Sequence, residues 1–388
     1  MMLGTVPGTI AELAADAGLG RVHVVAWRDL DDPGAGGSEL HITELAARWA
    51  AEGVDVTLVA KEVAGQPART ERQGIHVERR GGPLTVYGRN AVDARRRATR
   101  DDYDGLVEVW HGVSFLAPLW SRVPTIGIAH HVHGSQFRMV LPPGLAQLAG
   151  LLEKRVYPRL YRRTPLVTLS ESVKDQMVAE LGYDPAGVHV VSPGVAPSFT
   201  PGGERSPTPL VVTVGRLMPQ KGVPQLVDAL VGVKATHPDL EAVVVGDGPE
   251  RSAVEAHVRD RGAAGWIRVA GFVEEEELVG LYRRAWLLAS ASQKEGWGMT
   301  VTEAGACATP AVATRIPGHD GAIVDGETGL LVDGVDGLTA GIDRLLRDPD
   351  LRDRLGAAAR RHAAAHTWDR AALDTFRVLA LDATRPRS

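Results

Sequence analysis

Two carboxylates, Glu295 and Glu303, lie on either side of a glycine-rich turn that ends in an expected helix. Gly296 and Gly298 allow the backbone of this turn to approach a ligand closely. A helix opening near Met299 would direct unpaired N–H groups and the positive end of its dipole at that ligand. The pattern predicts an anion site, and the carboxylates beside it suit hydroxyl groups. Glycine-rich turns that bind nothing are also common in α/β proteins.

Two basic residues follow another expected strand, Leu210 to Val214. Arg216 and Lys221 flank the loop that leads from this strand into a helix, and Gly222 follows directly. Basic side chains in such a loop bind phosphate better than they support a core. This loop therefore predicts a phosphate site in the same half of the chain.

A second glycine loop, Gly34 to Ser38, follows the first expected strand, Val22 to Trp27. Ser38 is expected to cap the next helix, and Gly36 and Gly37 would offer backbone N–H groups to an anion. An ordinary turn fits the same pattern equally well.

Three histidines, His130, His131 and His133, follow the apolar run Thr125 to Ala129. Strand ends are where open α/β sheets bind ligands, and a single histidine facing a cleft is the favoured interpretation. Adjacent residues of an extended chain point to opposite faces, and no cysteine accompanies these histidines, so a zinc site is not expected. Short acidic pairs that could hold a cation, a pattern frequent by chance, occur at Asp29/Asp31, Asp102/Asp104 and Asp348/Asp350.

Apolar runs alternate with helical segments along the whole chain, which predicts parallel, doubly wound sheets. At 388 residues the chain is expected to form two domains, because single cores stop growing below this length. Residues 196–209 are dense in proline, glycine and serine and are the expected linker. Two sheets joined in this way are expected to bind their ligand in the cleft between them.

The composition, 44% hydrophobic and 23% charged, is that of a soluble globular protein, and the net charge of −5 gives no general attraction to nucleic acid. The single cysteine, Cys307, excludes a disulfide framework and is expected to be a small core residue. No apolar run has the length of a membrane span, and the N-terminus carries no basic leader, so a cytoplasmic enzyme is expected. The arginine-rich stretch from Arg69 to Arg100 is interpreted as a solvated helix face in preference to a patch for anionic lipid or an acidic acceptor.

With its parts in this order, the chain resembles the retaining nucleotide-sugar glycosyltransferases of family 4, which have the GT-B fold of two Rossmann-like domains. The sequence from Glu295 to Glu303 is similar to the family's signature of two glutamates separated by seven residues. Arg216 and Lys221 stand at the expected place upstream, and the Gly36–Glu39 loop matches the N-terminal glycine loop. The chain departs from many relatives at Ala196 and at residues 321–322, where an acidic residue is usual.

The resemblance implies a role for each matching residue. Arg216 and Lys221 would hold the donor diphosphate, Glu303 the ribose hydroxyls, and Glu295 the transferred sugar. His130 would reach the sugar from the N-terminal domain, with His131 as the alternative. The catalytic set is then His130, Glu295, Arg216 and Lys221. The donor-binding set is Gly36, Gly37, Arg216, Lys221, Phe272, Glu295, Gly296, Trp297, Gly298, Met299, Thr300 and Glu303.

The domains implied are an acceptor-side domain at 1–198, a donor domain at 199–368, and a last helix at 369–388 that crosses back to the first domain. The expected reaction is transfer of a sugar from a UDP- or GDP-linked donor to an acceptor hydroxyl, with retention and without a metal or other cofactor. The acceptor stays open among a small molecule, a glycan and a glycolipid, and so do peripheral membrane contact and oligomeric state. Open alternatives are a nucleotide-sugar epimerase, a phosphorylase and a non-catalytic binding protein. A nicotinamide dehydrogenase is disfavoured because neither glycine loop carries a full G-x-G-x-x-G.

Overall fold

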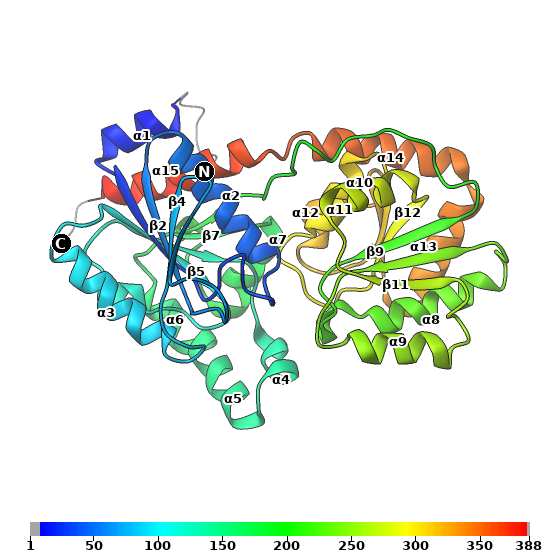
Figure 1. The fold of residues 1–388 in the computed structure, drawn as a ribbon, viewed down its shortest axis with the longest axis horizontal. Helices are drawn as coiled ribbons and strands as arrows, with labels where there is room; N and C mark the ends of the chain where they lie inside the picture. The colour runs from blue at the N-terminus through cyan, green and yellow to red at the C-terminus, as the bar shows by residue number, and fades with distance from the viewer. Residues whose placement is uncertain (1–7, 386–388) are drawn as a thin grey trace. The chain divides into compact units, whose positions relative to one another are not determined.

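A computed structural model describes residues 8–385, which form two compact units (Figure 1). Unit 1 comprises the chain up to Gly194 together with the segment that starts at Trp368, and unit 2 runs from Val195 to Thr367. The sequence interpretation placed these divisions at 198/199 and 368/369. The expected linker at 196–209 lies inside unit 2 by this division.

Unit 1 is built on an eight-stranded sheet of order β3-β4-β2-β1-β5-β6-β7-β8, in which only β3 runs antiparallel to its neighbour. Its strands are β1 (Arg21–Val25), β2 (Asp55–Ala60), β3 (Arg69–Arg72), β4 (Ile75–Arg79), β5 (Gly105–Trp110), β6 (Thr125–Ala129), β7 (Leu166–Thr168) and β8 (Val188–Val190). Its helices are α1 (Ile10–Ala17), α2 (Gly37–Ala51), α3 (Val86–Ala98), α4 (Phe137–Val140), α5 (Pro143–Leu151), α6 (Tyr157–Leu160), α7 (Glu171–Gln176) and α15 (Trp368–Ala383). Two π-helical segments, Leu152–Val156 and Met177–Leu181, continue α5 and α7.

Unit 2 is built on a six-stranded parallel sheet of order β11-β10-β9-β12-β13-β14. Its strands are β9 (Leu210–Val214), β10 (Glu241–Val245), β11 (Ile267–Gly271), β12 (Leu287–Ser290), β13 (Ala311–Thr314) and β14 (Gly329–Val332). Its helices are α8 (Val223–Lys234), α9 (Arg251–Asp260), α10 (Glu275–Arg284), α11 (Met299–Ala306), α12 (His319–Ala322), α13 (Gly334–Arg347) and α14 (Pro349–Ala363). Figure 1 shows α8 and α9 on one side of this sheet and α10, α11 and α14 on the other.

Each sheet reverses its strand order once. In unit 2 the chain builds outward from β9 through β10 to β11, then returns to add β12 on the other side of β9. In unit 1 the same reversal lies between β1 and β5. Loops at the carboxyl ends of the two strands at such a point diverge to opposite faces, and the crevice between them is where open α/β sheets bind ligands.

The last helix, α15, closes the core of unit 1 by packing on α1, α2, β5 and β6. The indole of Trp49 on α2 is fully buried, and its Nε1 donates a hydrogen bond to the carbonyl of Ala372 over 3.0 Å. The Phe376 ring meets the same indole edge-on with centroids 5.7 Å apart. Helix α15 is therefore an integral part of unit 1, although the rest of that unit ends at Gly194.

Three local expectations are settled by the structure. Ser38 does not cap α2, because the N-cap is Gly36 and the helix begins at Gly37. The stretch from Arg69 to Arg100 is not one solvated helix face, because β3 and β4 precede α3 and the β4 residue Arg79 is buried. Cys307 is confirmed as a buried residue at the end of α11.

In the described part of the chain, no helix combines the length and apolar character needed to cross a bilayer.

The packing of α15 predicts a large effect for Phe376→Ala. Removing a fully buried ring should lower the free energy of unfolding of unit 1 by about 3–5 kcal/mol, since the cavity adds to the lost transfer energy. Scanning calorimetry that resolves the two units would measure this loss. Leu381→Ala, on an exposed position of the same helix, is the control and should change little. Equal losses in the two variants would contradict this role of α15.

Candidate functional site

An ion pair joins the two sides of the strand reversal in unit 2. Lys221 Nζ, from the loop after β9, lies 2.5 Å from Glu295 Oε1, from the loop after β12. The two side chains are 25% and 18% exposed, so they are partly shielded and still reachable by a ligand. The Ser292 hydroxyl donates to the same carboxylate oxygen over 2.8 Å. Burial alone would raise the pKa of Glu295. The charge of Lys221, together with His319 and the hydrogen bonds from Lys221 and Ser292, outweighs burial and lowers this pKa, so the carboxylate is ionised at neutral pH.

Two glycines allow the backbones around this pair to approach closely. Gly222 has φ +61°, and a Cβ there would stand 2.3 Å from the carbonyl oxygen of Ala291, directly after β12. Gly318 has φ +95°, and a Cβ there would stand 2.7 Å from the carbonyl oxygen of Glu295. Any side chain at either position would push the loops apart, so both glycines are required by this geometry.

His319 completes the surroundings of Glu295 and was not identified from the sequence. It is fully buried at the start of α12, and its Nδ1 donates to the carbonyl of Thr314 over 2.7 Å. Burial lowers the pKa of this imidazole against the opposing charge of Glu295. One signal in the sequence could have identified this histidine, namely its position shortly after β13. Strand β13 is the neighbour of β12, and the carboxyl ends of neighbouring parallel strands meet at one edge of a sheet.

Glu303 lies within α11 and pairs with a tyrosine instead of a cation. The Tyr282 hydroxyl donates to Glu303 Oε2 over 3.0 Å. Burial raises the pKa of Glu303 to about 7, even though this hydrogen bond favours the ionised form. The two glutamates of the signature therefore differ in charge state, with Glu295 ionised and Glu303 close to half protonated at neutral pH.

The other predicted donor residues lie along the same edge of unit 2, except for Gly36 and Gly37, which belong to unit 1. Arg216 lies in the loop after β9, and Gly296, Gly298, Met299 and Thr300 form the turn and first residues of α11. Phe272 follows β11 and exposes 73% of its surface.

Trp297 belongs to the same turn, but its side chain points away from solvent. The indole is buried, donates from Nε1 to Thr302 Oγ1 over 2.8 Å, and packs edge-on against His366. Its ring therefore fixes the turn within unit 2, and only its backbone is left to meet a ligand.

A second charged contact crosses the strand reversal of unit 1. Glu39, in the first turn of α2, is fully buried, and His111 Nε2, directly after β5, lies 2.6 Å from its Oε1. The other carboxylate oxygen accepts from the N–H of Gly36 over 2.7 Å and from the Ser38 hydroxyl over 3.0 Å. Arg28 Nε donates to Oε1 over 3.2 Å. Burial raises the pKa of Glu39, but His111, Arg28 and the Gly36 N–H outweigh it and lower the pKa well below its usual range.

This network changes how the N-terminal glycine loop is understood. The Gly36 N–H, expected to face an anion, already donates to Glu39. The spacing of Gly36 and Glu39 is the signal that could have revealed the contact, because a glutamate at the third helical position commonly returns to the N-cap N–H.

His130 lies in a buried cluster of histidines next to this network. Its Nε2 is 3.3 Å from Nδ1 of His41, and its ring lies 6.5 Å from that of His111. Burial, followed by the nearby His41 and His111, lowers the pKa of His130 well below its usual value, so the imidazole is neutral. His131 lies outside this cluster, with its Nε2 2.9 Å from the Gln136 amide oxygen.

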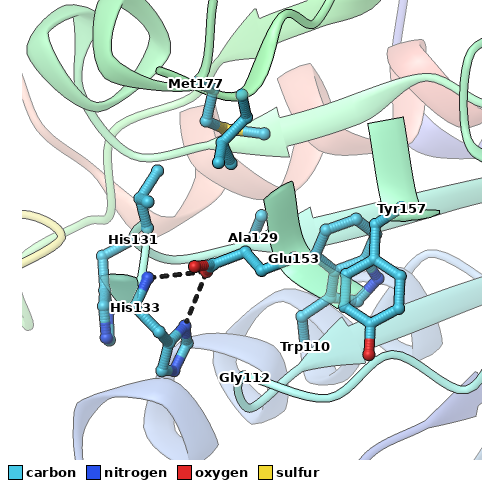
Figure 2. Close-up of a pocket in the computed structure, with 10 residues that line it drawn as sticks. Trp110, Gly112, Ala129, His131, His133, Glu153, Tyr157 and Met177 are labelled. Atoms are coloured by element: carbon cyan, nitrogen blue, oxygen red, sulfur yellow. Dashed lines mark hydrogen bonds and ion pairs between the residues drawn. The ribbon is translucent and has the colours of Figure 1, made fainter. Parts of the chain in front are cut away.

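The loop that follows His130 is held by Glu153, which lines a pocket of unit 1. Figure 2 shows the Glu153 carboxylate pointing at His133, with Trp110 and Tyr157 grouped beyond it. The two carboxylate oxygens accept the backbone N–H groups of His133 and Gly134 over 2.7 and 2.8 Å. The pocket wall is mostly apolar, since Ala129, Val132, Met177 and Leu181 also line it.

Arginines form ion pairs with Asp29 and Asp31, the acidic pair nearest to an expected ligand-binding edge. Arg79 contacts both carboxylates, at 2.6 Å for Asp29, and Arg72 also contacts Asp31. Within residues 8–385, no three metal-ligating side chains come together in a group that could hold an ion.

Comparisons with known proteins agree with this geometry. Residues 35–199 match the family Glycosyltransferase Family 4, and residues 198–362 match Glycosyl transferases group 1. The chain is 30% identical to the D-inositol 3-phosphate glycosyltransferase of Kribbella flavida, over 94% of this chain and 96% of that protein.

Two solved structures share the fold at low sequence identity. Sucrose-phosphate synthase from Thermosynechococcus elongatus superposes with a TM-score of 0.79 at 19% identity, covering 92% of this chain and 97% of that one. HepE from Anabaena, in complex with UDP-glucose, superposes with a TM-score of 0.72 at 18% identity, covering 92% and 98%. The expected fold class, two parallel-sheet α/β domains of the GT-B type, is confirmed.

The raised pKa of Glu303 predicts a pH dependence of stability. Between its usual value of 4.5 and about 7, the folded state binds more protons at Glu303 than the unfolded state does. Its contribution to the free energy of unfolding should therefore fall as pH rises through this window, by roughly 1–3 kcal/mol. Urea unfolding at several pH values, with Glu303→Gln as the control, measures the difference. Parallel pH profiles for the two proteins would rule out the raised pKa.

Proposed function

We propose that this chain, which belongs to the group 1 glycosyltransferases, transfers a sugar from a UDP- or GDP-linked donor to an acceptor hydroxyl with retention. Its glycosyltransferase activity follows from that membership. The donor nucleotide, the stereochemistry and the independence from metal ions are the parts that we propose.

The observation that carries the proposal is the Lys221–Glu295 pair at the strand reversal of unit 2. A nucleoside diphosphate sugar presents phosphate oxygens next to sugar hydroxyls, and an ammonium group beside a carboxylate matches that order. The N-terminus of α11 follows the same loop at Met299 and adds unpaired backbone N–H groups.

We assign the donor contacts along this edge as follows. Lys221 and Arg216 bind the diphosphate, and Glu295 with the backbone of residues 296–300 binds the transferred sugar. Glu303 accepts hydrogen bonds from the ribose hydroxyls, and the backbone at Phe272 borders the base. The complex of HepE with UDP-glucose supports a uridine nucleotide as the first donor to test.

The proposed reaction breaks the bond between the anomeric carbon and the terminal phosphate oxygen, and forms a bond from the acceptor oxygen on the same face of the sugar. The departing phosphate oxygen takes the acceptor proton, so no protein base is needed. Negative charge develops on the diphosphate, and Lys221 and Arg216 stabilise it there. These two cations supply the charge that a metal ion would otherwise supply. The neutral His130 has the role of positioning the sugar or the acceptor.

The name of a relative guides the choice of acceptors to test. The relative from Kribbella flavida is named for D-inositol 3-phosphate, so a phosphorylated polyol belongs among the first acceptors to test. A glycan and a glycolipid complete the set.

Product stereochemistry and metal dependence test the proposed reaction. A thermal-shift screen of UDP-, GDP-, ADP- and dTDP-sugars first identifies the donor, because a bound ligand stabilises the fold. Proton NMR of the product should then show the anomeric configuration of the donor, at a rate unchanged by EDTA. Inversion, or loss of turnover with EDTA that added Mg²⁺ restores, would overturn the corresponding part. Conversion of the donor without any acceptor would instead indicate an epimerase.

Loss of either basic residue should reduce transfer. Arg216→Ala and Lys221→Ala are each expected to lower kcat/KM by roughly 10²–10³-fold, since each removes a charge that stabilises the leaving group. Arg284→Ala, exposed at the far end of α10, is the matched control and should keep normal activity.

The double variant Lys221→Met/Glu295→Gln separates catalysis from folding, because it leaves no unpaired charge behind. It should unfold at a near-normal temperature and remain inactive. Near-normal turnover in both single variants would refute the assignment of the diphosphate site.

A further inference from the structure

Helix α5 and its neighbours present an apolar surface to solvent. Leu145, Leu148 and Leu151 are 56%, 51% and 55% exposed, and Met139 and Val156 add to the same segment. We call these five side chains the leucine face. On a helix, residues three apart lie on one side, so the three leucines form one stripe.

The orientation of α5 is the reverse of what its composition favours. The helix buries its small residues, Ala146 and Ala149, against Phe137, and exposes its leucines. A surface helix normally turns its largest apolar side chains toward the core. Figure 1 shows α4 and α5 together at the rim of their own unit, away from its sheet. A cluster of exposed apolar side chains of this kind marks an interaction surface.

Exposed basic residues flank the leucine face along the chain. Between Phe137 and Arg163 the chain has a single acidic residue, Glu153, which is buried and holds the His133–Gly134 backbone. The same segment contains six basic residues, although the whole chain has a net charge of −5. They are Arg138, Lys154, Arg155, Arg159, Arg162 and Arg163.

The arginines here differ from those in the other arginine-rich stretch. Between Arg69 and Arg100, five arginines pair with carboxylates, namely Arg69, Arg72, Arg79, Arg80 and Arg97. Within the part of the chain that the structure describes, none of the six basic residues along the leucine face forms an ion pair with a carboxylate. The positive charge beside the leucines is therefore available to an anionic partner.

We propose that the leucine face docks on an anionic lipid surface, with the leucines entering the interface and the flanking basic residues contacting lipid phosphates. An apolar helix stripe bordered by lysine and arginine is the pattern that binds such surfaces. A symmetric contact between two copies of the chain would bring like basic residues together, so a second copy fits this surface less well.

Docking has a structural link to the predicted cleft histidine. Glu153 lies in the π-helical turn that continues α5, and it binds the backbone directly after His130–Val132. Lipid bound at α5 would thus be coupled through one carboxylate to the loop that carries His130. Docking would therefore bring the loop that carries His130 near a lipid surface, whichever acceptor is used.

Vesicle sedimentation of the full chain tests the proposal without any turnover. The protein should bind phosphatidylcholine vesicles that contain phosphatidylglycerol, bind pure phosphatidylcholine weakly, and dissociate at high salt. Lys154→Ala/Arg155→Ala should lower the partition coefficient roughly 25-fold, at about fivefold for each basic residue near the surface. Leu145→Ser/Leu148→Ser should lower it at least about tenfold.

Matched controls use exposed residues of unit 1 outside this face. Arg95→Ala/Arg96→Ala on α3 and Leu84→Ser remove the same kinds of group and should leave vesicle binding unchanged. Circular dichroism and thermal unfolding establish that each variant is folded. Absence of binding to anionic vesicles, or equal losses in control and test variants, would overturn the proposal. A concentration-dependent dimer in sedimentation velocity that disappears in Leu145→Ser/Leu148→Ser would assign the face to self-association instead.

Discussion

The ion pair between Lys221 and Glu295 is the contact around which the candidate site of unit 2 is arranged. Both charges are partly withdrawn from water, where an isolated carboxylate would be costly, and each offsets the desolvation of the other. The pair can form because β9 and β12 are neighbours in the sheet. Along the chain, 72 residues lie between the end of β9 at Val214 and the start of β12 at Leu287. Gly222 and Gly318 then bring the surrounding backbone close enough to hold both side chains.

Unit 1 uses the same topology with a different balance of charge. At its strand reversal, Glu39 is enclosed by His111, Arg28 and the N-terminus of its own helix. The neighbouring His41 and His130 are neutral because burial lowers the pKa of each. The two sheets therefore differ at equivalent positions: unit 2 carries the partly exposed Lys221–Glu295 pair, whereas unit 1 carries neutral imidazoles beside a buried carboxylate.

The sequence predicted the fold because most strands are continuous apolar runs, such as Leu210–Val214, that only a sheet covered on both faces can bury. Strands β3 and β4 were missed because they carry arginines, and the charge of the buried Arg79 is neutralised by Asp29 and Asp31. Such pairings depend on strand order, which spacing along the chain does not reveal. The contacts of Glu39 with His111 and of His319 with Glu295 were missed for the same reason. The predicted donor residues other than Gly36 and Gly37 lie along one edge of unit 2, but their ligand contacts remain predictions.

The position of α15 determines the order in which the molecule can be completed. A ribosome makes most of unit 1 first, yet the helix that covers Trp49 and the surfaces of α1 and α2 is not available until residue 383 has been made. Unit 2 is one continuous segment and can fold as soon as it emerges. The unit that is begun first is thus finished last, and its unpaired apolar surface has to be shielded from other nascent chains during that interval.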